Sequence, residues 1–412
     1  VEAGNTSYLD VGGVLLDGAG ITVIRCPEGR ALDYAVPAGV EIIGDSAFRN
    51  CSALANISLP EGLTTIGDRA FELCSGLLAI TIPGTVSSLG ASSFSTCSGL
   101  TSVVIPDSVL TIGDHAFFDC SALASVTIGD SVASIGDSAF SRCGNLTGIT
   151  IPSAVASIGA SAFDSCSILT GIQVEPGSAH YASSAGVLFN ATLTELIRCP
   201  EGIAGSYAVP SGVTGISERA FFSCRDLTAI TIPTGVTSIG GYAFWGCSGL
   251  TSMTLPEGLA ILPERAFASC SGLNAVTLPD SLTSIGSYAF ASCAKLAGVT
   301  IPAGVTTIGD YAFQSCRGLT DITIPSGVTS IGPRAFYDCR DLAAVSLPEG
   351  LQAVGNGAFQ KCIALTEVII PSTVTILEAN VFNQCSALSS VVLRNGVISI
   401  GQAAFRYCSA LV

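Results

Sequence analysis

Histidine and cysteine are among the residue types that most often perform acid–base, nucleophilic or metal chemistry. The chain has two histidines, His115 and His180, and 17 cysteines. A hydrolase or acid–base enzyme needs a nucleophile, a base and an orienting group to converge in one place. His115 occupies a position that Arg69, Tyr242 and Tyr311 take elsewhere, and His180 lies in an irregular stretch. We therefore expect both histidines to be solvated surface residues and the protein not to be an enzyme.

The cysteines recur in an Ala-Phe-x-x-Cys pattern with a constant period, as the regular numbering of its phenylalanines shows. Fifteen of the 17 cysteines follow a phenylalanine of the pattern by three positions, and only Cys26 and Cys199 lie outside it. The phenylalanines form two series, Phe48, Phe71, Phe94, Phe117, Phe140 and Phe163, then Phe221, Phe244, Phe267, Phe290, Phe313, Phe336, Phe359, Phe382 and Phe405.

One cysteine per repeat is a poor fit to a metal site, because metal ligands cluster at short spacings. The sequence also lacks a Gly-rich phosphate loop, a His-Glu-x-x-His motif and a calcium loop. We expect the cysteines to be small buried hydrophobes with reduced thiols, and we expect no metal and no cofactor. Oxidation between some neighbouring thiols stays open, because stacked repeats would bring their Cα atoms within about 5 Å.

The repeat predicts the elements that position these residues. In residues 100–120 a Leu-x-x-Val-x-Ile segment alternates as a half-buried strand does, and Pro106 ends it because proline cannot donate a ladder hydrogen bond. Val109 and Ile112 then turn inward, and Gly113 permits a tight corner. The Asp-x-Ala-Phe-x-x-Cys stretch has a capping residue followed by 3-to-4 spacing, which predicts a single helical turn of either the α or the 3₁₀ type.

Each unit is one coil that cannot bury its own apolar face, so the coils must stack into continuous columns of equivalent side chains. The predicted fold is a repeat solenoid. We expect a right-handed leucine-rich-repeat superhelix with a parallel β-sheet on one face and short strands and single helical turns on the other. One continuous solenoid should cover residues 1–412, without a second folding domain.

The stretch between Phe163 and Phe221 is longer than one period, and its irregular part has a copy at the N-terminus. For example, Gly13-Val14-Leu15 matches Gly186-Val187-Leu188. We predict a β-hairpin in each copy, with its turn near Asp17-Gly18 or Asn190-Ala191.

Both ends of the sequence fall inside a coil without a polar cap, so we expect the natural protein to extend beyond them. The predicted segments are a modified N-terminal coil (1–36), a first array (37–175), a hairpin insertion (176–209) and a second array (210–412).

The composition limits the partners. A net charge of −15 and a pI near 4.4 argue against nucleic acid and against anionic membranes. No apolar run approaches the roughly 18 to 20 residues that span a bilayer, so this segment should not insert into a membrane.

In a solenoid the repeated positions hold the fold, whereas the variable positions are free to specialise. The turn positions that flank each phenylalanine vary most, and in the second array they hold aromatic residues, which are favoured interface anchors. The alternative is that these rings only cover the ends of neighbouring turns. The candidate ligand contacts are Phe222, Tyr242, Trp245, Tyr288, Tyr311 and Tyr337.

Two further positions, eight and ten residues after each phenylalanine, should face outward from the main sheet. The second of them is mostly Thr or Ser, as in Thr231, Thr254 and Thr277. A flat threonine array could bind ice, but threonine is also a good strand residue that pairs across strands.

The pattern Leu-x-x-Ile-x-Ile-Pro-x-x-Val-x-x-Ile-Gly-x-x-Ala-Phe-x-x-Cys, as in residues 77–97 and 319–339, resembles the BspA-like leucine-rich-repeat family. The resemblance covers nearly the whole chain. It implies a secreted or surface-anchored protein linked to adhesion, and it implies no shared catalytic residues. We therefore predict an extracellular or cell-surface binding scaffold that recognises a host matrix or cell-surface protein or glycan through an extended face. The alternative is a structural spacer that projects another domain from the cell.

Overall fold

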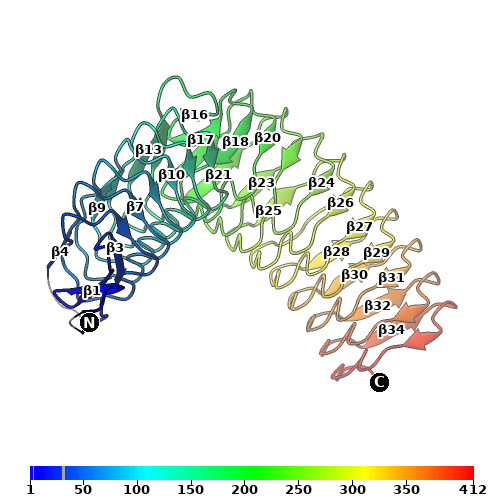
Figure 1. Cartoon of the computed structure of the whole chain (residues 1–412). Helices are drawn as coiled ribbons and strands as arrows, with labels where there is room; N and C mark the ends of the chain where they lie inside the picture. The colour runs from blue at the N-terminus through cyan, green and yellow to red at the C-terminus, as the bar shows by residue number, and fades with distance from the viewer. Residues whose placement is uncertain (3, 30–32) are drawn as a thin grey trace. The chain divides into compact units, whose positions relative to one another are not determined.

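The computed structural model describes residues 1–2, 4–29 and 33–412. The chain forms two compact units, the first made of Val1–Leu193 and Cys199–Ile203 and the second of Thr194–Arg198 and Ala204–Val412. Each unit is a stack of short coils that carry parallel strands (Figure 1). The predicted solenoid is confirmed within each unit, while one continuous stack over the whole chain stays a prediction.

The first unit begins with an antiparallel meander of β1 (Tyr8–Val11), β2 (Val14–Asp17) and β3 (Thr22–Arg25), in which the β2–β3 turn includes Asp17 and Gly18. Its main-sheet strands are β4 (Tyr34–Ala35), β6 (Ile57–Ser58), β9 (Ser102–Val104), β11 (Ser125–Thr127), β13 (Gly148–Ile151) and β15 (Gly171–Val174). The strands of its second sheet are β5 (Ile42–Ile43), β7 (Thr65–Ile66), β8 (Ser88–Leu89), β10 (Thr111–Ile112), β12 (Ser134–Ile135) and β14 (Ser157–Ile158). A hairpin of β16 (Tyr181–Ser184) and β17 (Val187–Asn190) follows, with its turn at Ala185-Gly186. A second turn comes directly after β17, at the predicted Asn190-Ala191, where the Leu193 N–H donates to the Asn190 carbonyl over 3.0 Å.

The second unit begins with β18 (Glu195–Arg198). Its main-sheet strands are β19 (Gly205–Ala208), β21 (Leu227–Thr231), β23 (Ser252–Thr254), β25 (Ala275–Thr277), β28 (Asp321–Thr323), β30 (Ala344–Ser346), β32 (Glu367–Ile370) and β34 (Ser390–Leu393). The strands of its second face belong to two sheets: β20 (Gly215–Ile216) and β22 (Ser238–Ile239) to one, and β24 (Ile261–Leu262), β26 (Ser284–Ile285), β27 (Thr307–Ile308), β29 (Ser330–Ile331), β31 (Ala353–Val354), β33 (Ile376–Leu377) and β35 (Ser399–Ile400) to the other.

Equivalent residues of successive coils lie in register, so each core position forms a column. In the main sheet Val103 lies opposite Val126, its equivalent in the next coil, and in the second sheet Ile112 lies opposite Ile135. The repeat phenylalanines are buried, except for Phe405, and stack with ring centroids 4.9 to 6.0 Å apart. These columns confirm the predicted core, because no coil could bury such side chains alone.

The Ala-Phe-x-x-Cys segment is not a helical turn, so that part of the prediction is wrong. The residues two before and two after the phenylalanine have positive φ, as at His115 and Asp119, both 58°. Backbone N–H groups alternate in direction: Phe118 donates to His115 of its own coil over 3.0 Å, whereas Phe117 donates to Ala139 of the next coil over 2.8 Å. Because every second N–H is used between coils, the i→i−4 bonds of a helix cannot form. The described residues contain no helix.

The corner glycine of the repeat, such as Gly113, allows two successive coils to pack closely. Gly113 does not have a positive φ, but a Cβ atom there would lie 2.7 Å from the Ala91 nitrogen and the Gly90 carbonyl carbon of the preceding coil. Glycine at this position therefore lets the backbones of two coils approach each other.

Candidate functional site

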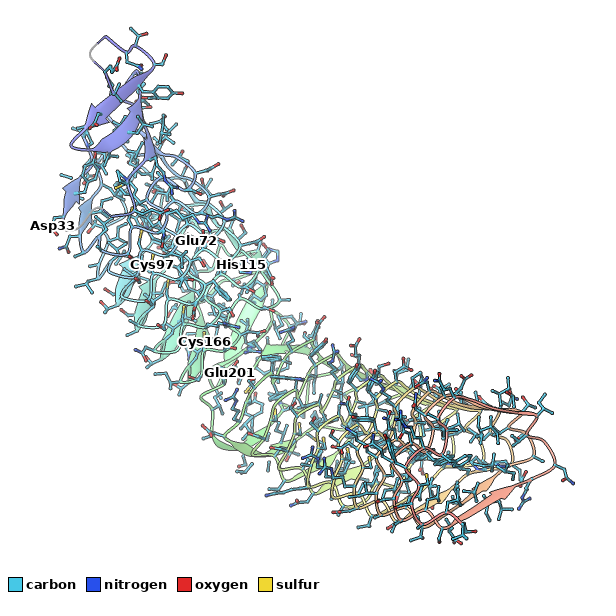
Figure 2. All side chains as sticks on the ribbon, turned by 90° about the horizontal axis from the view of Figure 1, so that it is seen from below. Asp33, Glu72, Cys97, His115, Cys166 and Glu201 are labelled. Carbon is cyan, nitrogen blue, oxygen red and sulfur yellow. The ribbon has the colours of Figure 1, made fainter. Side chains whose placement is uncertain are left out.

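Both histidines lie at the surface, as predicted. His115 is exposed on the first unit (Figure 2), with its ring centroid 5.4 Å from that of Phe118. His180 is exposed just before the β16 hairpin. No group of three or more His, Cys, Asp or Glu side chains among the described residues is placed to hold a metal ion. Within the same residues, no helix has the length and hydrophobicity to cross a bilayer.

The cysteines of the repeat are buried, as predicted, and most of them have a hydrogen-bonding role. The Cys97 thiol donates to the carbonyl of Phe71 over 3.1 Å, and the Cys120 thiol donates to Phe94 over 3.1 Å. Burial raises the pKa of Cys120 to about 12. A buried thiol that stays protonated at neutral pH is a poor nucleophile and metal ligand, so this column stabilises the coils rather than supplying reactive groups.

The six predicted contact residues lie in the turn segments of the second unit and are half-buried. The structure brings them together in pairs. Phe222 and Trp245 stack with centroids 4.7 Å apart, and Tyr288 and Tyr311 stack at 4.6 Å with an interplanar angle of 4°.

Cationic side chains that the sequence reasoning missed join these pairs. The guanidinium of Arg265 lies 5.2 Å from the Tyr242 ring centroid and 4.5 Å from that of Tyr288. We name this surface the aromatic–arginine ladder: Arg219, Phe222, Tyr242, Trp245, Arg265, Tyr288, Tyr311, Arg334, Tyr337 and Lys361. Its signal was present in the sequence, because the position two before each phenylalanine reads Arg, Tyr, Arg, Tyr, Tyr, Arg from Arg219 to Arg334.

Many ring faces and hydroxyl groups of the ladder interact with other residues of the ladder. Ring faces contact neighbouring rings or guanidinium groups, the Tyr311 hydroxyl accepts from Arg334 over 3.1 Å, and Arg265 donates to the Tyr242 hydroxyl. Where a ring is covered on both faces, a partner can still contact its edge and the neighbouring guanidinium groups.

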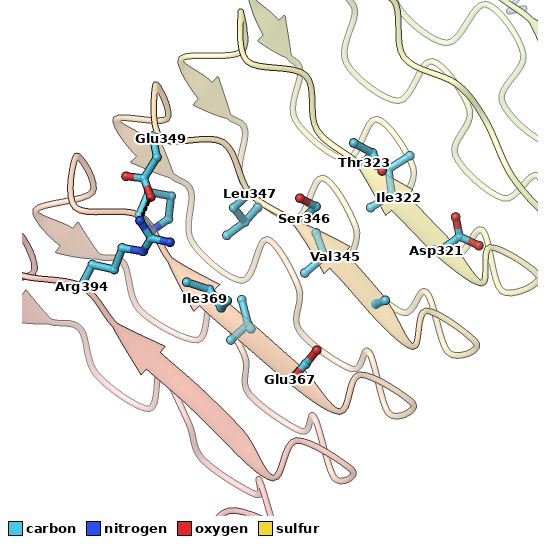
Figure 3. Close-up of a pocket in the computed structure, with 13 residues that line it drawn as sticks. Asp321, Ile322, Thr323, Val345, Ser346, Leu347, Glu349, Glu367, Ile369 and Arg394 are labelled. Carbon is cyan, nitrogen blue, oxygen red and sulfur yellow. Dashed lines mark ion pairs between the residues drawn. The ribbon is translucent and has the colours of Figure 1, made fainter.

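A second surface lies on the outward face of the main sheet. The positions eight and ten residues after each phenylalanine are exposed there, as predicted, and hold mainly small and hydroxyl side chains. Val392 departs from this rule, and so do three other residues of the second unit: Asp321, Glu367 and Ile369. The last three border a groove of about 440 Å³ over β28, β30 and β32 (Figure 3). The groove was not predicted from the sequence, although these positions were expected to face outward, because attention fell on the threonines that most coils share and not on the residues that replace them.

One family model matches residues 32–107, 94–204, 204–320 and 306–412, and its description is a BspA type leucine rich repeat region with 6 copies. These matches together span nearly the whole chain. The comparison with curated proteins gave no significant match.

Solved structures with the same fold cover most of the chain. A leucine-rich repeat protein from Bacteroides ovatus is 27% identical over 93% of this chain and 90% of its own, with a TM-score of 0.54. A leucine rich cell surface protein from Faecalibacterium prausnitzii is 25% identical over 94% and 93%, with a TM-score of 0.52. A leucine-rich repeat protein from Eubacterium ventriosum, 21% identical over 82% and 84% with a TM-score of 0.55, shares the fold.

Proposed function

The chain belongs to the BspA-type leucine-rich-repeat family, and from this premise we propose that it is a non-catalytic binding scaffold of the cell surface or of the extracellular space. Its ligand is a host matrix or cell-surface protein or glycan. The similarity to a solved protein described as a leucine rich cell surface protein supports the location.

The main observation behind the proposal is that residue types repeat from coil to coil in the interior but vary at the surface. The buried columns repeat the same residue types from coil to coil, and their thiols have raised pKa values because they are buried. Side-chain diversity is greatest at solvent-facing positions of the turns and the main sheet. Such a molecule presents surface chemistry on a rigid frame, which suits recognition and avidity over several modest contacts.

The aromatic–arginine ladder is the proposed contact surface. Tyr, Trp and Arg are the residue types most enriched among interface residues that dominate binding energy. The ladder combines all three, held in place by the stacking described above.

The test is a binding screen of the 412-residue chain against immobilised matrix proteins, mucins and bacterial cells. We expect saturable retention on at least one of them. If the chain is retained by none, the scaffold proposal is wrong and the spacer is favoured, in which the array only projects another domain.

A further inference from the structure

We propose that the groove over β28, β30 and β32, which we name the sheet groove, binds a protein segment in which a basic side chain neighbours an apolar one. This inference goes beyond the ladder as contact surface but rests on the proposed binding function. The ligand is a polypeptide with a cationic residue, because the groove combines carboxylates that have no cationic partner among the described residues with an exposed apolar side chain.

The groove lies between two strand pairs of the main sheet. β28 pairs with β30, and β32 pairs with β34, but the sheet order of the described residues joins no strand pair between β30 and β32, just as it joins none between β21 and β23 or between β25 and β28. Val345 and Leu347 are partly exposed at the groove, whereas the equivalent Ile322 and Ile324 are buried. These two partly exposed side chains supply an apolar floor.

Two carboxylates flank one edge of this floor. Asp321 lies beside Ala344 in the strand register, and Glu367 follows one coil later, so the backbones of the two acidic residues are about 10 Å apart. The methyl group of Ala344 leaves the space between them open. An ammonium or guanidinium group placed over Ala344 would have a carboxylate on each side, which matches the geometry of charge-assisted hydrogen bonds.

The negative charge at this edge is not neutralised by the protein itself. Asp321 accepts a hydrogen bond from the Thr320 hydroxyl over 3.0 Å, and in the part of the chain that is described no cationic side chain pairs with Asp321 or Glu367. The cation of the groove, Arg394, is held by Glu349 at the opposite end (Figure 3). The net charge of −15 adds long-range attraction for a basic ligand.

Ile369 supplies the apolar contact. Its position holds threonine or serine in most coils, yet the Ile369 side chain is 48% exposed at the groove. It follows Glu367 by two residues and so lies on the same face of β32. A ligand strand with a basic residue at one position and a leucine two positions later places both side chains on one face, toward Glu367 and Ile369 respectively.

The probe is a dye-labelled peptide in which arginine and leucine alternate with serine, and its control carries glutamate in place of arginine. Fluorescence anisotropy should show binding of the arginine peptide below about 1 mM, the weak end of specific affinities. We expect Asp321→Asn with Glu367→Gln to weaken binding about fivefold, since exposed charge pairs each contribute modestly. Ala344→Lys should weaken it further by placing a cation between the carboxylates, and Ile369→Thr should weaken it without changing the salt dependence.

The matched control is Asp310→Asn with Glu378→Gln, which removes two exposed carboxylates of the second unit outside the groove. Circular dichroism checks that each variant folds. Equal affinities of the groove and control double variants, or no binding of the arginine peptide to the wild-type protein, would overturn the inference. The binding screen distinguishes this inference from the proposed function. If an immobilised ligand retains the groove variants as well as the wild type, the sheet groove is not the contact site, but the chain is still a binding scaffold.

Discussion

The thiol of Cys97 donates a hydrogen bond to the backbone carbonyl of Phe71, one coil earlier, with an Sγ···O distance of 3.1 Å. The same carbonyl also accepts the backbone N–H of Cys74 in its own coil, over 3.1 Å. Each such carbonyl thus has one donor from within its coil and one from the next. This explains why the repeat uses cysteine where alanine or valine would bury an equally apolar group.

Cys97→Ala should therefore lower the free energy of unfolding by about 1 to 2 kcal/mol, through the lost hydrogen bond and the lost burial of sulfur. Cys97→Ser keeps a hydrogen-bond donor, so any decrease in its free energy of unfolding should reflect the cost of burying a hydroxyl group in an apolar column. Denaturant unfolding followed by circular dichroism measures both. Ser121→Ala, at an exposed site, is the control. A Cys97→Ala protein as stable as this control would contradict the bonding role.

The thiol column also predicts a loss of stability in alkali. Burial raises the pKa of Cys120, Cys316 and Cys385 to about 12, against about 8.5 for an exposed thiol. Below pH 8.5 both folded and unfolded chains hold these protons, so the stability is fully present. Above it the unfolded chain releases protons that the folded chain keeps, and stability falls through pH 12 by about 1.4 kcal/mol per pH unit for each thiol.

The check is the denaturation midpoint between pH 8 and pH 11 for the wild type and for Cys120→Ala. The variant should lose less stability over this range, because one such thiol is absent. The same slope in both proteins would show that the Cys120 thiol does not have a raised pKa.

The close approach of two backbones at Gly113 predicts that alanine is tolerated differently at equivalent positions of different coils. Gly113→Ala should cost about 1 to 3 kcal/mol, because its Cβ would overlap the backbone of the preceding coil. Glu378→Ala, at the equivalent position of another coil that already accommodates a Cβ, should cost much less. Thermal unfolding midpoints compare the two, and equal losses would refute the packing argument.

The aromatic–arginine ladder predicts separate effects on binding and on stability. Replacing Tyr242, Trp245 and Tyr311 together with alanine should weaken ligand retention at least tenfold in a protein that still folds, since such residues dominate interface energies. Arg265→Gln removes the cation between Tyr242 and Tyr288 and should lower stability by about 1 kcal/mol. A triple variant that folds and binds as the wild type does would show that the rings only cover neighbouring turns.

The buried columns could be predicted from sequence because burial depends on the repeat itself: Phe117, Cys120 and Ile112 recur at fixed offsets and all lie inside. The helical turn could not be excluded, because the spacing of Ala116, Phe117 and Cys120 fits a helix equally well. The deciding feature is the positive φ of residues such as His115, and a side chain of that type gives no local signal for it.

The aromatic–arginine ladder and the sheet groove could be predicted from the sequence only in part, for a different reason. The aromatic residues could be identified from their variable positions, but the cations between them are recognised only when equivalent positions are compared as a column. Asp321 and Glu367 are ordinary exposed residues along the chain, and only stacking brings them to either side of Ala344. Proximity between coils is a property of the assembled stack, so no local pattern reports it.

If this chain binds a ligand through its variable surfaces, biolayer interferometry on immobilised matrix proteins and mucins will detect the interaction. We expect saturable binding of the wild type and of the control double variant to at least one ligand, with an affinity loss of at least about fivefold in the ladder or the groove variant. No binding by the wild-type chain, or equal affinity of all folded variants, would contradict this expectation.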